Sequence, residues 1–143
     1  MVVREARDQA EVDAALELRR RVFCDEQGVA PAADRDGRDG EALHLVAIED
    51  GAVVGTCRLV VDGERARLGR MAVKAELRGR GIGAELLEAA ERAALRVGAV
   101  RVTLHAQSAA ASLYARGGYQ ARGKRFLEEG IEHVRMEKCL SSA

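Results

Sequence analysis

A glycine-rich turn at the start of an amphipathic helix constrains this chain more than any other feature. Residues 68–73 are predicted to form a strand, and glycine occupies three of the six positions in the turn 78–83 that follows. From Ile82 to Val97, apolar residues then recur at helical spacing. The first N–H groups of such a helix lack intrahelical partners and carry positive potential, and glycine lets a ligand approach the backbone closely. The segment therefore predicts a phosphate-binding turn.

Three known glycine spacings can be compared with this turn. Gly79, Gly81 and Ala84 satisfy the dinucleotide pattern G-x-G-x-x-A, but that site also needs an acidic residue after the next strand, and none is present there. A mononucleotide P-loop requires Gly-Lys-Ser/Thr, which does not follow these glycines. The spacing that fits is R-x-x-G-x-G, carried by Arg78, Gly81 and Gly83. An ordinary tight turn that packs a helix on a sheet is the alternative.

The composition bounds the remaining possibilities. With 143 residues the chain is expected to be a single domain, 1–143, and its formal net charge of zero gives no global attraction to nucleic acid or membrane. Tryptophan is absent and aromatic residues make up 3%, which leaves few stacking platforms for bases. The three cysteines are widely spaced and form no CxxC pattern, so we expect reduced thiols in the cytoplasm and no metal. No apolar run reaches transmembrane length.

The rest of the chain alternates strand and helix patterns without an internal repeat. The expected order is β, α, β, β, β, α, β, α, β, β, an α/β (α+β) fold. Because a helix separates strand 68–73 from strand 99–105, these two are expected to be parallel, joined by a right-handed crossover. The expected strands are 2–6, 42–49, 52–61, 65–73, 99–105, 119–127 and 131–140, and the expected helices follow Asp8, begin at Ile82 and begin near Gln107.

Two stretches near the N-terminus differ from the regular pattern. In the run of arginines 19–21, we expect a solvated flank, with Arg19 as the residue that turns inward. The helix face on which Arg19 lies also holds Val12, Leu16 and Phe23, joined by Ala15 and Val22. Residues 24–41 are acidic, contain glycines and hold the only proline, Pro31. This stretch is too long for an ordinary connection, and long loops in compact domains are functional or disordered.

Three pieces of the sequence together resemble the GNAT superfamily of N-acyltransferases. The first is Met71-Ala72-Val73 followed by the turn 78–83, and the second is the segment 112–119, which is similar to the family's LYxxxGF signature. The third points to the ElaA-like branch and comprises 18–27, Pro31, Asp34, Asp36, Gly37, His44 and 128–133. The resemblance covers nearly the whole chain. It implies the GNAT fold, a mixed and mostly antiparallel seven-stranded sheet with a central pair of parallel, splayed strands and flanking helices.

By the same resemblance, acetyl-CoA is the expected co-substrate. The main chain of Met71, Ala72 and Val73 would pair with the pantetheine arm and polarise the thioester carbonyl. Gln107 could bond the pantetheine or cap the helix. The pyrophosphate would lie on the backbone of Arg78, Gly79, Arg80, Gly81, Ile82 and Gly83. Tyr114 would contact the coenzyme and act as general acid toward the leaving thiolate, the alternative being a core tyrosine.

The acceptor amine must lose a proton before it attacks, and the sequence leaves the base open. Many relatives carry a glutamate on the strand before the turn, but this strand holds arginines and no carboxylate. The candidates are Glu26, His44 and His133, each of which could instead be structural or merely exposed. An acceptor that binds as the free amine would need no base.

The acceptor side of the cleft is expected to be walled by Glu26, Asp34, Asp36, Glu129 and His133. Because these groups are acidic or ionisable, they would attract a small cationic amine or a peptide amine. A solvated acidic loop is the alternative. The Asp-x-Asp run lacks the twelve-residue frame of a calcium loop.

The sequence therefore predicts an acetyl-CoA-dependent N-acetyltransferase that transfers the acetyl group directly from thioester to amine. Two alternatives stay open. One is a GNAT-fold module that binds acyl-CoA as a sensor or partner protein with little catalysis, and the other is an activity like that of acyl-homoserine-lactone synthases. Neither nucleic acid nor a membrane is an expected partner, a homodimer is left open, and the acceptor is not identified.

Overall fold

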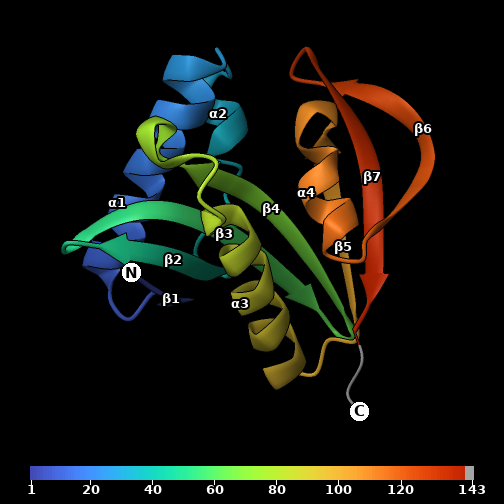
Figure 1. The fold of residues 1–143 in the computed structure, drawn as a ribbon, viewed down its shortest axis with the longest axis horizontal. Coiled ribbons are helices and arrows are strands. Elements are labelled where there is room, and N and C mark those ends of the chain that lie inside the picture. Colours follow the sequence, from blue (N-terminus) through green and yellow to red (C-terminus); the bar gives the residue numbers. More distant parts are fainter. Residues whose placement is uncertain (141–143) are drawn as a thin grey trace.

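A computed structural model describes residues 1–140 as one seven-stranded mixed sheet with strand order β1-β2-β3-β4-β5-β7-β6 (Figure 1). The strands are β1 (Val2–Glu5), β2 (Leu43–Glu49), β3 (Ala52–Asp62), β4 (Arg65–Val73), β5 (Arg101–Gln107), β6 (Gln120–Glu128) and β7 (Ile131–Cys139). The pair β4 and β5 is parallel, and the other neighbouring pairs are antiparallel. The predicted fold class and the parallel pair are confirmed, with strand ends displaced by one or two residues.

Helices cover both faces of this sheet (Figure 1). The helical segments are α1 (Gln9–Arg19), the π-helix η1 (Arg20–Glu26), α2 (Pro31–Asp34), η2 (Ala75–Leu77), α3 (Ile82–Arg96), η3 (Ser108–Ala110) and α4 (Ala111–Arg116). The long helix α3 and the short α4 lie on one face, while α1 and its continuation lie on the opposite face beside β2, β3 and β4. No helix within residues 1–140 is long and apolar enough to cross a membrane.

The first helix begins as the sequence predicts and buries part of the predicted face. The Asp8 carboxylate accepts a hydrogen bond from the Glu11 backbone N–H at 2.9 Å, which caps α1. Of the predicted face, Ala15, Arg19 and Val22 are buried, whereas Val12 and Leu16 are only half-buried. The fully buried residues of α1 and η1 are Ala15, Leu18, Arg19 and Val22. The inward turn of Arg19 is confirmed, and Leu18 was missed.

The stretch 24–41 is more ordered than its loop-like sequence predicts. The first helix continues as η1 to Glu26, and Pro31 then opens the single turn α2. Proline fits this first position because its φ is already helical and its missing N–H is not needed there. The prediction of one long loop is therefore wrong at its start and in its middle, while residues 35–41 form no helix or strand, and η1 packs against β4.

The helix α3 docks closely on the sheet because β3 contains a glycine at the contact. A Cβ added at Gly55 would lie 2.9 Å from Ile82 Cγ2, so any side chain there would push the start of α3 away. The buried stripe of α3 includes Leu86, Ala90 and Ala94, as predicted. Val97 was expected on this stripe but lies beyond the last turn and is 45% exposed. The contact at Gly55 fixes where the glycine turn stands relative to β4.

The parallel strands β4 and β5 separate halfway along their length (Figure 1). Their pairing ends at Leu68 and Leu104, so the edge of β4 that faces β5 has no strand partner beyond that point. A bulge in β4 accompanies the separation: Arg70 has a φ of 55°, and the β3–β4 register shifts there. Backbone groups on such an edge need other hydrogen-bond partners, since burying them unpaired is costly.

Candidate active site

Two cavities meet at the point where β4 and β5 separate. The first, here called the glycine cavity, has a volume of about 630 Å³ and lies between the start of α3 and α4. The second, the wedge cavity, has a volume of about 720 Å³ and lies between β4, β5, the segment after η1 and the β6–β7 turn. Both are lined by Val73, Arg78, Gly83 and Leu113, which form their common border.

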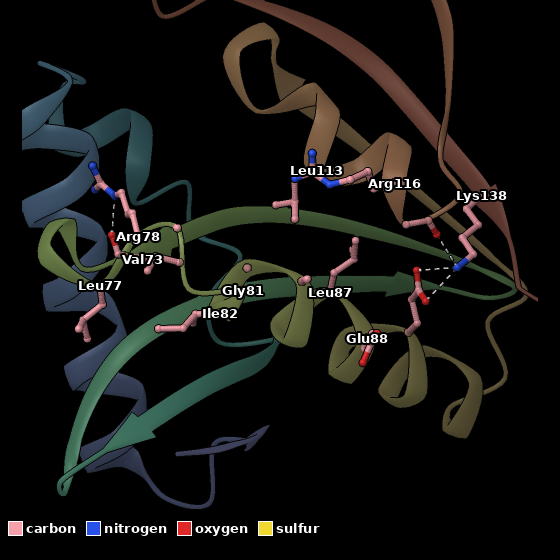
Figure 2. A pocket seen from close by; sticks show the side chains of 15 residues that line it. Val73, Leu77, Arg78, Gly81, Ile82, Leu87, Glu88, Leu113, Arg116 and Lys138 are labelled. Atoms are coloured by element: carbon pink, nitrogen blue, oxygen red, sulfur yellow. Dashed lines mark hydrogen bonds and ion pairs between the residues drawn. The ribbon is translucent and has the colours of Figure 1, made fainter.

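The glycine cavity is built mainly from backbone. Gly79 and Gly81 have φ values of 82° and 83°, a left-handed conformation that glycine adopts without strain. A Cβ added at either position would meet nothing within 4 Å, so the turn is open on that side. Three cationic side chains, Arg78, Arg116 and Lys138, line the same cavity (Figure 2). The unpaired N–H groups of the first turn of α3 and these cations suit an anionic diphosphate.

Lys138 belongs to a small network at the far end of the glycine cavity. Its Nζ donates to the carbonyl of Gly117 at 2.8 Å and contacts both carboxylate oxygens of Glu91, at 3.1 and 3.2 Å (Figure 2). The Tyr119 hydroxyl also donates to Glu91, at 2.8 Å. The network ties α3 to β7, and the sequence gave no sign of it.

Two side chains at the end of η1 and just after it, Glu26 and Gln27, contact residues across the mouth of the wedge cavity. Glu26 accepts from the Arg78 guanidinium at 2.7 Å, and Arg78 Nε donates to the Val73 carbonyl at 3.0 Å (Figure 2). Gln107 donates its side-chain amide to Gln27 at 2.9 Å. We call the pairs Glu26–Arg78 and Gln27–Gln107 the clasp. Glu26, expected as a base or acceptor contact, thus lies at the glycine turn and lines neither cavity.

The predicted coenzyme-binding residues fall into two groups. Met71, Ala72 and Val73 line the wedge cavity on the stretch of β4 that β5 leaves unpaired. In the turn, Arg80 lines neither cavity and is exposed. The Ile82 side chain is 3% exposed and packs in the core, so only its backbone could meet a ligand.

Tyr114 lines the wedge cavity from α4. Tyr114 is 5% exposed, and its ring packs edge-on against the Tyr119 ring, with the ring centroids 6.1 Å apart. Burial, with a smaller effect of the neighbouring Cys57 thiol, raises the pKa of Tyr114 well above its usual range, so the phenol keeps its proton at neutral pH. Burial also raises the pKa of Cys57 to about 12, which makes this thiol a poor nucleophile.

The acidic loop that follows η1 flanks the wedge cavity, but its carboxylates are already paired. Three arginines, Arg19, Arg58 and Arg70, hold the three aspartates Asp34, Asp36 and Asp39. The closest contacts are Arg19 to Asp39 at 2.6 Å, Arg58 to Asp36 at 2.8 Å and Arg19 to Asp34 at 3.2 Å. Asp34 and Asp36 line the cavity, but Asp34 is 3% exposed. The loop therefore offers no excess negative charge to an acceptor.

The three predicted base candidates end up in different places. Glu26 is in the clasp. His44 is 7% exposed on β2, has its Nε2 2.9 Å from the Asp39 carbonyl and lines neither cavity. His133 lines the wedge cavity, together with Glu129 of the same hairpin. Of the three, His133 is the one that an acceptor in the wedge cavity could reach.

Sequence reasoning missed Glu128, which contacts His133, and His105, which contacts Glu128. Glu128 places Oε1 3.2 Å from His105 Nδ1 and Oε2 3.6 Å from His133 Nε2, and all three residues line the wedge cavity. Strand alternation was the available signal: His105 stands two positions before Gln107, on the same face of β5. Neither this cluster nor any other His, Cys, Asp and Glu group within residues 1–140 has the arrangement of a metal site.

Comparisons with known proteins give the following matches. The profile of the acetyltransferase (GNAT) domain family matches residues 4–140. The uncharacterized N-acetyltransferase YjcF of Bacillus subtilis is 31% identical over 134 residues, which cover 93% of this chain and 96% of YjcF. An acyl-CoA N-acyltransferase from Pseudomonas aeruginosa superposes with a TM-score of 0.83 and 31% identity over 96% of this chain and 98% of its own. Escherichia coli ElaA superposes with a TM-score of 0.85 and 25% identity, over 96% and 99%.

Proposed function

The chain belongs to the GNAT family of acetyltransferases, and on this basis we propose that it is an acetyl-CoA-dependent N-acetyltransferase acting on a primary amine. One observation carries the proposal: the glycine cavity and the wedge cavity meet at Val73 and Arg78, where β4 and β5 part. A coenzyme with its diphosphate on the glycine turn can extend along β4 into the wedge cavity. An amine that enters from the other side would then meet the thioester.

The coenzyme would be held mostly by main chain. The N–H groups at the start of α3 would bind the diphosphate, helped by the helix dipole. The unpaired edge of Met71, Ala72 and Val73 would hydrogen-bond the pantetheine arm as an added strand would. A backbone N–H near Met71 or Ala72 would polarise the thioester carbonyl, as an oxyanion-type donor. Arg78 and Gln107 would give up their hydrogen bonds to Glu26 and Gln27 and bind the coenzyme instead.

Tyr114 would assist the departure of the coenzyme sulfur. Its pKa is raised by burial, so the phenol is protonated when the reaction starts. A thiol is a stronger acid than such a phenol, and full proton transfer to the thiolate is therefore uphill even after the C–S bond has broken, so the phenolate would have to recover its proton from solvent. The hydrogen bond from the phenol to the developing thiolate supplies the early stabilisation. Direct transfer is favoured because the buried Cys57 thiol, with a pKa of about 12, is unsuited to carry an acyl group.

A second candidate function is an acyl-CoA-binding module with little catalysis. The observation that favours it is the composition of β4, Arg65–Val73, which brings arginines and no carboxylate to the wedge. Such a module would bind acetyl-CoA as the enzyme does and would leave the thioester intact.

One experiment separates these candidates. Purified protein is incubated with acetyl-CoA and a panel of primary amines, free thiol is followed continuously, and products are identified by mass spectrometry. Thiol release that depends on an amine, with an acetylated product, supports the enzyme. Calorimetric binding of acetyl-CoA without turnover on any amine supports the binding module. Absence of both binding and turnover would overturn both proposals.

A further inference from the structure

The wedge cavity contains very few free groups that could take a proton. Its loop-side carboxylates, Asp34 and Asp36, are held by Arg19, Arg58 and Arg70. A carboxylate that accepts charged hydrogen bonds is a poor base, because protonation would cost those bonds. On the opposite wall, the turn between β6 and β7 brings Glu128, Glu129 and His133 to the same cavity.

His133 is oriented by its own hairpin. Its Nδ1 lies 2.7 Å from the carbonyl oxygen of Ile131, and a carbonyl can only accept, so Nδ1 carries a hydrogen. In the neutral ring, Nε2 then holds the lone pair. The ring is 7% exposed and stacks on Phe126 with centroids 5.9 Å apart, which fixes its plane. With Nδ1 protonated, Nε2 is the ring nitrogen that can accept a proton, and it lies on the side of the ring that faces Glu128.

Glu128 connects this histidine to a second one. Its two carboxylate oxygens lie 3.6 Å from His133 Nε2 and 3.2 Å from His105 Nδ1. The Arg67 guanidinium approaches the same Nδ1 of His105 at 3.3 Å. Arginine can only donate and carboxylate can only accept. The His105 Nδ1 therefore accepts from Arg67 when it is bare and donates to Glu128 when it is protonated.

We propose that His133 is the base that takes the proton from the acceptor amine, with Glu128 and His105 as positioning residues that stabilise the resulting charge. This inference rests on the proposed function. His133 Nε2 takes one proton from the ammonium, directly or through one water, and the freed nitrogen lone pair attacks the thioester carbonyl carbon. The C–S bond breaks and sulfur leaves with the bonding electrons. Nitrogen loses a second proton as the amide forms, the coenzyme thiol gains one, and the other passes from His133 to solvent.

The charges around the cluster support this assignment. The other titratable or charged groups that line the wedge cavity are Glu128 and Glu129 in the hairpin, His105 on β5, Arg58 on β3, Arg67 and Arg70 on β4, Arg78 in the glycine turn, Tyr114 on α4, and Asp34, Asp36 and Arg38 in the loop. Arg58 and Arg70 are held by the aspartates of the loop, and Arg67 contacts His105 and forms no ion pair among residues 1–140. An imidazolium at His133 thus gains Glu128, whose carboxylate lies 3.6 Å away, as its counter-ion.

The decisive variant is His133→Gln, which keeps a hydrogen-bonding side chain but cannot take a proton. With the best amine from the panel, we expect kcat at pH 7 to fall by about 10²-fold or more, the usual contribution of a positioned base. Acetyl-CoA affinity should change less than twofold. The loss should shrink markedly by about pH 10, because alkylamines, like lysine with its reference pKa of about 10.4, then arrive increasingly deprotonated.

Failure of this inference can be told apart from failure of the proposed function. If the wild type binds acetyl-CoA but acetylates no amine, the proposed function falls and the inference falls with it. If the wild type is active and His133→Gln is equally active, or loses the same factor at pH 7 and pH 10, only the inference is overturned.

A second measurement tests the cluster without turnover. Ring ¹⁵N spectra of the wild type should show neutral His133 as the Nδ1–H tautomer. Glu128→Gln should shift the ring signals of His105 and His133 together. The matched control is Glu132→Gln, which removes one charge from the same hairpin at a residue paired with Arg125, and it should shift neither. An Nε2–H tautomer would overturn the role assigned to His133 Nε2. Equal spectra for Glu128→Gln and wild type would overturn the role assigned to Glu128.

Discussion

The glycine cavity and the wedge cavity share a border but are held in shape by different interactions. The turn of the glycine cavity depends on backbone conformation: positive φ at Gly79 and Gly81 and the docking of Ile82 against Gly55. The loop wall of the wedge cavity depends on side-chain charge, since ion pairs between three arginines and three aspartates hold it. A diphosphate is the same in every acyl-CoA, and backbone suits such a constant ligand. Side chains, which substitutions can change one at a time, line the part that would meet the acceptor under the proposed function.

The largest expected effect breaks the charged wall. Arg19→Met fills a similar volume but leaves Asp34 and Asp39 without their shortest charged contacts in a site where Arg19 is 1% exposed. Breaking a buried ion pair from one side costs about 3–5 kcal/mol, and urea unfolding should show a loss of stability of that size. Glu17→Gln, which removes a surface pair with Arg20, should cost less than about 1 kcal/mol. Equal losses for the two variants would mean that the wall does not depend on buried charge.

The next effect concerns the wall that α4 contributes to the wedge cavity. Tyr114→Phe removes a hydroxyl from the wedge cavity and should leave the fold and the acetyl-CoA affinity nearly intact. Turnover should fall by about 10²-fold, the range for a positioned proton donor. Tyr119→Phe is the matched control: it loses its hydrogen bond to Glu91, and turnover should stay within twofold. The measurement is steady-state kcat under conditions in which the chemical step limits the rate. Full activity of Tyr114→Phe would remove the phenol from the mechanism.

A smaller effect is expected from the backbone-built turn. Gly81→Asp puts a carboxylate where a diphosphate would bind and a side chain where φ is 83°. Calorimetry should show acetyl-CoA affinity reduced by about tenfold or more, which corresponds to about 1.4 kcal/mol. Gly63→Asp makes the same change at a turn glycine with φ of 61° and open surroundings, away from both cavities. If both variants bind acetyl-CoA like the wild type, the diphosphate lies elsewhere.

The smallest effect should distinguish the two regions by pH. The Arg58 hydrogen bond holds the pKa of Asp36 well below its usual range. A lowered folded-state pKa gives stability that is present above the unfolded value, about 3.9, and is lost as pH falls toward the folded value. The protection of backbone amides from hydrogen exchange, relative to their intrinsic exchange rates, should therefore fall around residues 34–39 between pH 4 and pH 3 before it falls in α3. Asp36→Asn should show less pH dependence in that window, and identical profiles for variant and wild type would rule out this linkage.

The sequence predicted those parts of the molecule whose signals are local. Asp50-Gly51 and Asp62-Gly63, sequences that favour tight hairpin turns, lie where β2 joins β3 and β3 joins β4, and the R-x-x-G-x-G spacing marked the glycine turn. Turn chemistry and helix starts are set by neighbouring residues, so the sequence alone can indicate them. The continuation of the first helix to Glu26 was missed, since the same acidic residues suit a loop or a helix.

The charged wall could not be predicted for a different reason. Arg58 meets Asp36 across 22 positions, and Arg70 meets Asp36 across 34, so no periodicity connects them. The aspartates could be seen in the sequence, but their neutralisation could not, and an attraction for cationic amines was inferred from them. His105 and Glu128 were missed for the same reason, because the contact depends on how β5, β7 and β6 pair.

The clasp has a consequence for how long a coenzyme stays bound. Arg78 and Gln107 already have partners in the free protein, so coenzyme binding at this site would exchange hydrogen bonds and add few. The Glu26–Arg78 pair is 37% and 45% exposed, and such a pair is worth at most about 1 kcal/mol. A closed population favoured by that amount would weaken the apparent affinity for the coenzyme by about sixfold. In the proposed enzyme, the same closing contacts would favour departure of free coenzyme A, and product release often limits turnover in enzymes. Glu26 and Gln27 would thereby help set the residence time of the coenzyme.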